Sequence, residues 1–108
     1  MAYESCFPSR LKAARKKKAI SQTELGRRIG LDSQSASARM NNYEKGRHQP
    51  DFNMAKNIAE QLDVPVAYLY CECDEMAELI LAFHKLASEQ RKRLLLDFLE
   101  LQGTTQEG

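Results

Sequence analysis

The chain has 108 residues, which is enough for one domain with a modest core, or for one domain plus an appendage. No stretch approaches the twenty apolar residues of a membrane span, and residues 1–10 lack the apolar run of a signal peptide, so we expect a cytoplasmic protein with no membrane partner. The three cysteines are odd in number and poorly spaced for a disulfide framework, which agrees with a reducing compartment.

The net charge of +1 hides a strong asymmetry between the two halves of the chain. Residues 1–50 carry eleven Lys and Arg against four Asp and Glu, a balance of +7, whereas residues 51–108 carry five against eleven, a balance of −6. A polyanion facing the first half would gain free energy from counterion release. The alternative is that runs such as residues 16–18 only solvate a surface.

The first predicted element is a helix over residues 9–18. Phe7, Leu11 and Ala14 recur at i, i+4 and i+7, and Ser9 stands where an N-cap would serve. The lysines of this segment fall in its last turn, where the helix dipole favours positive charge.

A second, short helix is predicted to begin at Ser21. Ser21 and Glu24 have the spacing of a capping box, in which each side chain bonds the other residue's amide. Leu25 and Ile29 share one face, and Gly30 permits the positive φ that a helix C-terminus prefers. A sharp turn should therefore follow residue 29.

A third helix is predicted after the polar run 32–35, which offers several N-caps. Ala36, Met40 and Tyr43 repeat at i, i+4 and i+7 as its inner face. Its outer face carries small, amide and guanidinium groups, which suit a close approach to base edges in the DNA major groove. The members of this face are Gln34, Ser35, Ser37, Ala38, Arg39, Asn41 and Asn42.

These residues resemble the Cro/lambda-repressor-like (XRE-type) helix-turn-helix transcriptional regulator family. The resemblance covers about residues 9–70 and is carried by Gln22-Thr23-Glu24-Leu25, Gly30, Tyr43-Glu44-Lys45-Gly46 and Pro50. The segment 31–35 is longer than the family usually has. Ala19 occupies a place where the family commonly has a left-handed glycine, so we expect either a cost of about 1 kcal/mol or a different turn there.

The resemblance implies an all-α fold with a five-helix DNA-binding domain over residues 1–70. It also implies a structural ion pair between Arg15 and Glu44, which is a stronger interpretation of Glu44 than a catalytic one. The expected base contacts are Gln34, Ser35, Ser37, Arg39, Asn41 and Asn42. The expected phosphate contacts are Gln22, Lys45, Arg47 and His48.

Beyond residue 50, two further helices are expected to complete the core. Asp51 or Asn53 caps a helix whose apolar stripe runs from Ala55 to Leu62, and Pro65 suits the first turn of a short helix ending near residue 70. Residues 71–75 are interpreted as an acidic linker. A metal site using Cys6, Cys71, Cys73 and the two histidines is disfavoured, since no C-x-x-C spacing occurs.

Residues 76–102 are predicted to form a helical hairpin, followed by a disordered tail over residues 103–108. The second helix of the hairpin carries apolar residues over a wider arc than packing against one neighbouring helix requires. This favours a homodimer through Leu95, Leu96 and Leu99. The alternative is that this helix folds back and completes the core.

The function predicted from the sequence is a sequence-specific double-stranded DNA-binding transcriptional regulator, similar to a phage or prophage repressor, acting on a palindromic operator. Two alternatives that would also bind DNA are a DNA-binding antitoxin and a restriction-modification controller. An alternative of another class is a helical protein-interaction module without DNA binding. No catalytic motif, cofactor or small-molecule ligand is evident, so an enzyme is not expected.

Overall fold

The computed structural model describes residues 5–105, which form seven α-helices and no strand. This arrangement confirms the predicted all-α class. No helix in the described range is long and apolar enough to cross a membrane. In chain order the helices are α1 (Phe7–Lys18), α2 (Gln22–Arg28), α3 (Ser33–Lys45), α4 (Phe52–Leu62), α5 (Val66–Leu69), α6 (Asp74–His84) and α7 (Ser88–Thr105).

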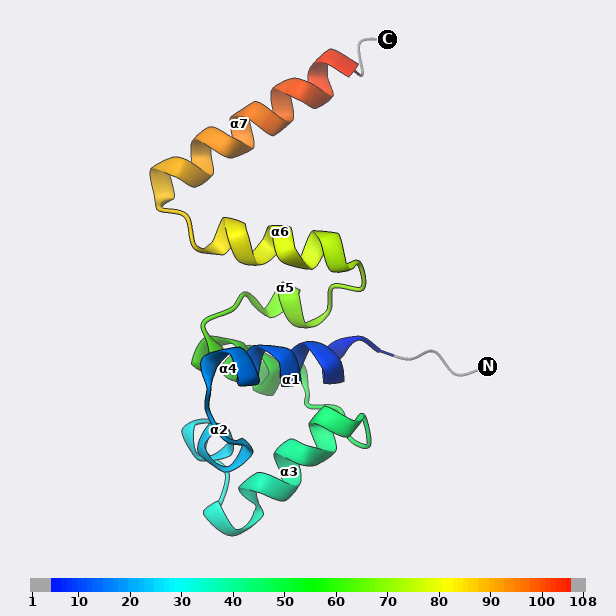
Figure 1. The fold of residues 1–108 in the computed structure, drawn as a ribbon, viewed down its shortest axis with the longest axis vertical. Coiled ribbons are helices and arrows are strands. Elements are labelled where there is room, and N and C mark those ends of the chain that lie inside the picture. Colours follow the sequence, from blue (N-terminus) through cyan, green and yellow to red (C-terminus); the bar gives the residue numbers. More distant parts are fainter. Residues whose placement is uncertain (1–4, 106–108) are drawn as a thin grey trace, which may run out of the picture.

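The helices α1 to α5 enclose the hydrophobic core. Each of them contributes one of the largest fully buried side chains, which are Leu11, Leu25, Met40, Ile58 and Leu69. In Figure 1, α2 and α3 lie at one end of the molecule, α1, α4 and α5 in the middle, and α6 above them. The two helices with the predicted DNA-binding residues are therefore at the end opposite α7.

The start of α1 differs from the prediction. The helix begins at Phe7, two residues early, with Cys6 as N-cap and Pro8 in its first turn, where the missing N–H of proline costs nothing. Ser9 therefore lies inside the helix, and its hydroxyl donates to the Cys6 carbonyl oxygen at 3.1 Å. At the other end, Ala19 takes the left-handed conformation, with φ 62° and ψ 38°.

The predicted linker over residues 71–75 is fastened to the core. Arg10 donates from Nε to the Cys71 carbonyl oxygen and from Nη2 to Asp74, each at 2.9 Å. Cys71 is buried, and the Cys73 thiol accepts from the Met76 amide at 3.4 Å. This cap starts α6 at Asp74, inside the predicted linker.

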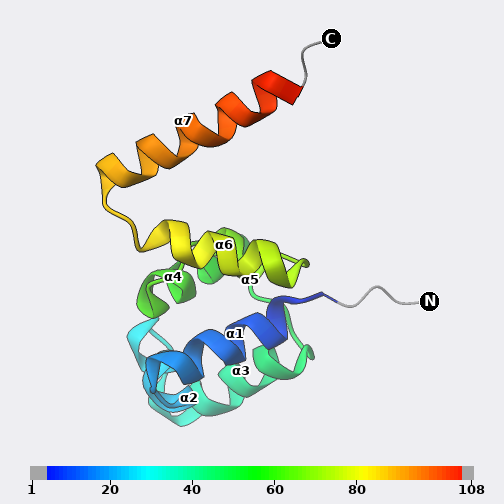
Figure 2. The same ribbon diagram turned by 45° about the horizontal axis from the view of Figure 1, so that its top comes forward.

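The last helix, α7, stands away from the rest of the molecule. Figures 1 and 2 agree that α6 and α7 diverge from the short connection between them, so the two helices form an open V. The Cα radius of gyration is 16.7 Å, against about 13 Å expected for a compact chain of this length. The alternative in which this helix folds back onto the core is therefore not observed.

The helix α7 also continues into residues 103–105, which were predicted to belong to the tail, and ends at Thr105. Gly103 does not have the positive φ that would stop a helix. Residues 106–108, the remainder of the predicted tail, lie outside the described residues.

Candidate nucleic-acid interface

The helix α2 begins as predicted at Ser21, whose hydroxyl oxygen accepts from the Glu24 amide at 3.0 Å. The Glu24 side chain, which in a full capping box would accept from the Ser21 amide, forms ion pairs instead. The Glu24 carboxylate accepts from Arg28 at 2.9 Å and from Arg27 at 3.4 Å, at the i+4 and i+3 positions. The first turn of α2 thus carries a charge network of its own on the surface.

A close contact sets the position of α3 against α2. Gly26 is buried, and a Cβ built on it would lie 2.6 Å from the Cβ of Ala36. Only glycine at position 26 and a small residue at position 36 allow this approach. Gly30 then has φ 92°, so the turn between the helices is short, and residues 33–35 form the first turn of α3.

The helix α3 has two chemically distinct faces. Ala36, Met40 and Tyr43 are at most 5% exposed, so the helix has the rotation predicted from the sequence. On the opposite face Gln34, Ala38, Asn41 and Lys45 follow one another at i, i+4, i+7 and i+11. Exposed residues on this side are Gln34, Ser37, Ala38, Arg39 and Lys45, and half-exposed ones are Ser35, Asn41 and Asn42.

Two of the expected base contacts, Arg39 and Ser35, have hydrogen-bond partners three or four residues away in the chain. The Arg39 guanidinium donates to the Tyr43 hydroxyl at 3.3 Å. The Ser35 hydroxyl donates to the Asp32 carbonyl oxygen at 3.3 Å. The other members of the expected base-contacting face are the amide side chains of Gln34, Asn41 and Asn42 and the small residues Ser37 and Ala38.

A buried polar network connects α1, α2 and α3. Arg15 donates to both carboxylate oxygens of Glu44, with Nη2 3.1 Å from Oε1, and the Glu44 side chain is only 2% exposed. Gln22 donates to the same Glu44 oxygen at 3.1 Å and lies 3.3 Å from Asn41 Oδ1. The expected phosphate contact Gln22 and the expected base contact Asn41 are thus joined, and the ion pair holds the helix that carries Asn41.

The loop after α3 directs basic side chains along the same end of the molecule. Gly46 has φ 76°, and the Arg47 amide donates to the Asn42 carbonyl oxygen at 2.9 Å, which turns the chain back beside the helix. Lys45, Arg47 and His48 are all exposed, as phosphate contacts must be.

A polar cleft of about 560 Å³ between the start of α1 and the end of α3 adds a residue that sequence reasoning missed. Lys12 lines this cleft together with Lys45 and His48. Lys12 was overlooked because only the fold brings the exposed side of α1 beside the end of α3. With Lys45 and Arg47 it makes three Lys and Arg side chains along the expected phosphate path.

The residues predicted for the dimer interface lie on α7, at the far end of the molecule (Figure 1). Leu95, Leu96 and Leu99 are 50%, 65% and 52% exposed. Four further large apolar side chains of the C-terminal helices are also exposed, namely Met76, Leu79, Phe98 and Leu101. No buried side chain occurs among those described for α7.

Comparisons with known proteins agree with this geometry. A family model described as "Helix-turn-helix" (HTH_3) matches residues 11–69, which span α1 to α5. A solved structure, "Crystal structure of transcriptional regulator BswR", is similar to this chain with a TM-score of 0.84 and 47% sequence identity, and the match covers 92% of this chain and 97% of that one. Among curated protein sequences, none matches.

The family match covers more than half of the chain, and it includes the short turn, the two-faced α3 and the ion pair that holds it. The structural match extends over α6 and α7 as well, because it leaves only 8% of the chain uncovered. The chain therefore belongs to the XRE-type helix-turn-helix family of DNA-binding transcriptional regulators.

Proposed function

We propose that this protein is a sequence-specific repressor of the phage or prophage type, which reads operator half-sites by inserting α3 into the major groove. The observation that carries the proposal is the outer face of α3, where Gln34, Asn41 and Asn42 lie away from the buried Met40 and no exposed side chain of the helix is acidic or bulky and apolar. Amide side chains recognise adenine through paired hydrogen bonds. Because its DNA partner is cytoplasmic, we also assign the protein to the cytoplasm.

We assign two roles to the residues of this end of the molecule. Gln34, Ser35, Ser37, Arg39, Asn41 and Asn42 contact bases, whereas Gln22, Lys45, Arg47 and His48 contact phosphates. Exposure and position support the division, because the first group lies along α3 and the basic members of the second lie at its end and in the following loop. Phosphate contacts fix the register, and base contacts select the sequence.

The two roles are separable by mutation. Asn42→Ala should relax the preference at one base position by about 1 to 3 kcal/mol. Arg47→Ala should instead weaken binding to every sequence and lower the slope of log affinity against log salt by about one unit. Gel shifts against genomic fragments, at several stated salt concentrations, measure both. Equal affinity for all fragments would leave only the non-specific electrostatic interaction and would refute the proposal.

We further propose that the protein binds a palindromic operator as a homodimer paired through α7. The support is the exposed apolar face that contains Leu95, Leu96 and Leu99, on a helix that leaves the body of its own chain. Contiguous exposed apolar surface marks a site of protein–protein interaction. Pairing at this end leaves both copies of α3 free to reach half-sites about 34 Å apart.

Leu96→Glu with Leu99→Glu should convert the dimer into a monomer, with Asp97→Ala on the polar face of α7 as the matched control. Sedimentation of full-length protein at micromolar concentration measures the change. A second variant that ends at residue 87 removes only α7 and keeps the buried Ala77 of α6. A monomeric wild-type protein, or a dimer that survives both changes, would contradict the assignment.

A further inference from the structure

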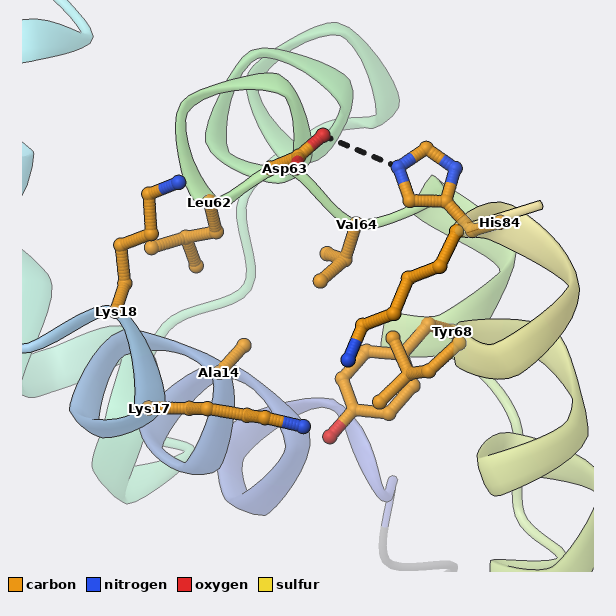
Figure 3. Close-up of a pocket in the computed structure, with 10 residues that line it drawn as sticks. Ala14, Lys17, Lys18, Leu62, Asp63, Val64, Tyr68 and His84 are labelled. Atoms are coloured by element: carbon orange, nitrogen blue, oxygen red, sulfur yellow. Dashed lines mark hydrogen bonds and ion pairs between the residues drawn. The ribbon is translucent and has the colours of Figure 1, made fainter. Parts of the chain in front are cut away.

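A cavity of about 160 Å³ lies between the DNA-binding core and α6, on a different face from the outer side of α3. Its walls come from the end of α1, the end of α4 and the segment after it, α5, and the last turn of α6 (Figure 3). Engineered cavities of about 150 Å³ hold a benzene ring. This cavity is therefore large enough for the apolar body of a small organic molecule.

The floor of the cavity is apolar. Ala14, Leu62, Val64 and Leu81 line it, and the ring of Tyr68 closes one side. Leu62 and Tyr68 are buried members of the hydrophobic core, so the floor is fixed by the packing of the domain itself. An apolar wall with a few convergent polar groups is the usual composition of a small-molecule site.

The rim of the cavity has an excess of positive charge. Lys17 and Lys18 reach it from α1 and Lys85 from the C-cap of α6, whereas Asp63 is its only carboxylate. Asp63 is already paired with His84 at 3.1 Å, as the dashed line in Figure 3 marks. Among the described residues, none of the three lysine ammonium groups has an ion-pair partner within 4.0 Å.

Lys17 connects the charged rim to the cavity. Its side chain extends toward the hydroxyl end of Tyr68 in Figure 3, so an ammonium donor and a phenolic group face the same space. A carboxylate near them would accept from both, while its hydrocarbon part covered Ala14 and Val64. The polar groups of the cavity thus suit the carboxylate of such a ligand, and its apolar groups suit the hydrocarbon part.

We propose that this cavity binds a small organic anion with an apolar body, of the class of aromatic or branched carboxylates. No sequence motif indicates this site, because its lining residues come from segments that are distant along the chain. The proposal does not depend on DNA binding, since the outer face of α3 contributes nothing to the cavity.

The ligand would also join α6 to the core. At its start α6 is held by the contact between Arg10 and Asp74, and at its end by the contact between His84 and Asp63. A molecule touching Ala14, Leu62 and Leu81 together adds a further contact between α6 and the core, near the end from which α7 departs. Hydrogen exchange of the amides of α6 should therefore slow when the ligand is bound.

The test uses full-length protein without DNA and three probes. Benzoate carries both an apolar ring and a carboxylate, inorganic phosphate carries charge alone, and benzyl alcohol carries the ring alone. Titrations followed by the NMR signals of Ala14, Val64 and Leu81 should give an affinity for benzoate at least tenfold higher than for either of the others. Equal shifts with all three probes, or no shift with benzoate up to 10 mM, would overturn the proposal.

Matched variants separate the cavity from general surface charge. Lys17→Gln with Lys85→Gln should lower the affinity for benzoate at least fivefold, whereas Lys16→Gln with Lys56→Gln removes the same charge outside the cavity and should leave the affinity unchanged. All four lysines are exposed, so these variants keep the core intact. If both double variants lowered the affinity for benzoate equally, or if neither lowered it, benzoate would not be bound in this cavity.

Discussion

Ala19 is held in a conformation that costs free energy for any residue with a Cβ. Its φ of 62° closes α1, and its amide donates to the Lys16 carbonyl oxygen at 3.0 Å. Because glycine adopts this region freely, Ala19→Gly should raise the free energy of unfolding by about 0.5 to 1 kcal/mol. Chemical denaturation measures the change.

Ala13→Gly provides the control for this prediction. Ala13 is an exposed residue inside α1, so glycine there should lower the stability by about 0.5 to 1 kcal/mol. If both substitutions lowered the stability alike, the strain at Ala19 would be contradicted.

Asp63 shows how a single surface contact affects a titration. The hydrogen bond and the charge of His84 hold the pKa of Asp63 below its ordinary value, and Lys18 adds a smaller effect of the same sign. A lowered pKa in the folded state means that the carboxylate stabilises the fold above its unfolded pKa, and that this stabilisation is lost as the pH falls through the folded value. The window for the loss therefore lies at and below about pH 3.9.

His84→Gln should raise the pKa of Asp63 toward the ordinary value, as followed by NMR titration of its carboxyl carbon. Lys18→Gln is the comparison, and it should produce the smaller rise. An unchanged pKa in the His84 variant would show that the contact does not form in solution.

At the scale of helices, the position of α3 depends on one missing side chain. Gly26→Ala would put a methyl group 2.6 Å from the Cβ of Ala36, with the Ala36 Cα and carbonyl oxygen both 3.1 Å away. Since backbone atoms cannot yield as a flexible side chain can, we expect a loss of about 2 to 3 kcal/mol in stability and a weaker DNA affinity.

Gly103→Ala is the matched control for Gly26→Ala. Apart from the backbone of its own helix and its chain neighbours, no atom of the described residues lies within 4 Å of a Cβ built on Gly103, which lies inside α7. The substitution should leave the stability unchanged or raise it by up to about 1 kcal/mol through helix propensity. Thermal unfolding of the two variants side by side distinguishes close packing from a general effect of alanine.

The elements that the sequence predicted well are those specified locally. The caps at Ser21 and Asp51 each depend on a side chain and an amide three residues later, at 3.0 and 2.8 Å. Ser9 was wrongly chosen as a cap because Pro8, also a local signal, starts the helix earlier. Gly26 was missed because its requirement comes from Ala36, on another helix.

For the whole molecule, the main difference from prediction is the course of α7. The apolar pattern of residues 94–101 was visible in the sequence. Such a pattern does not show which surface the apolar side chains will pack against. The structure leaves Leu96 and Leu101 65% exposed, on a molecule whose longest dimension is 57 Å. The fold of the core followed from local signals, whereas these signals do not decide what covers the apolar face of α7.

A dimer through α7 predicts that thermal stability depends on protein concentration. Association favours the folded state by mass action, so the unfolding temperature should rise with each tenfold increase in concentration. The Leu96→Glu and Leu99→Glu double variant should lose this dependence and keep the unfolding temperature of the dilute protein. Calorimetry at several concentrations tests the prediction, and a concentration-independent wild type would contradict it.

The contact between Gly26 and Ala36 also bears on how such chains vary in evolution. Between α2 and α3 there is room for only one Cβ methyl group, and in this chain it is the methyl group of Ala36. Alanine at position 26 becomes tolerable only when the residue at position 36 is glycine, which has no methyl group. The two positions should therefore covary among homologues, with Ala at 26 accompanied by Gly at 36, and changes at both together should be commoner than the product of their separate frequencies.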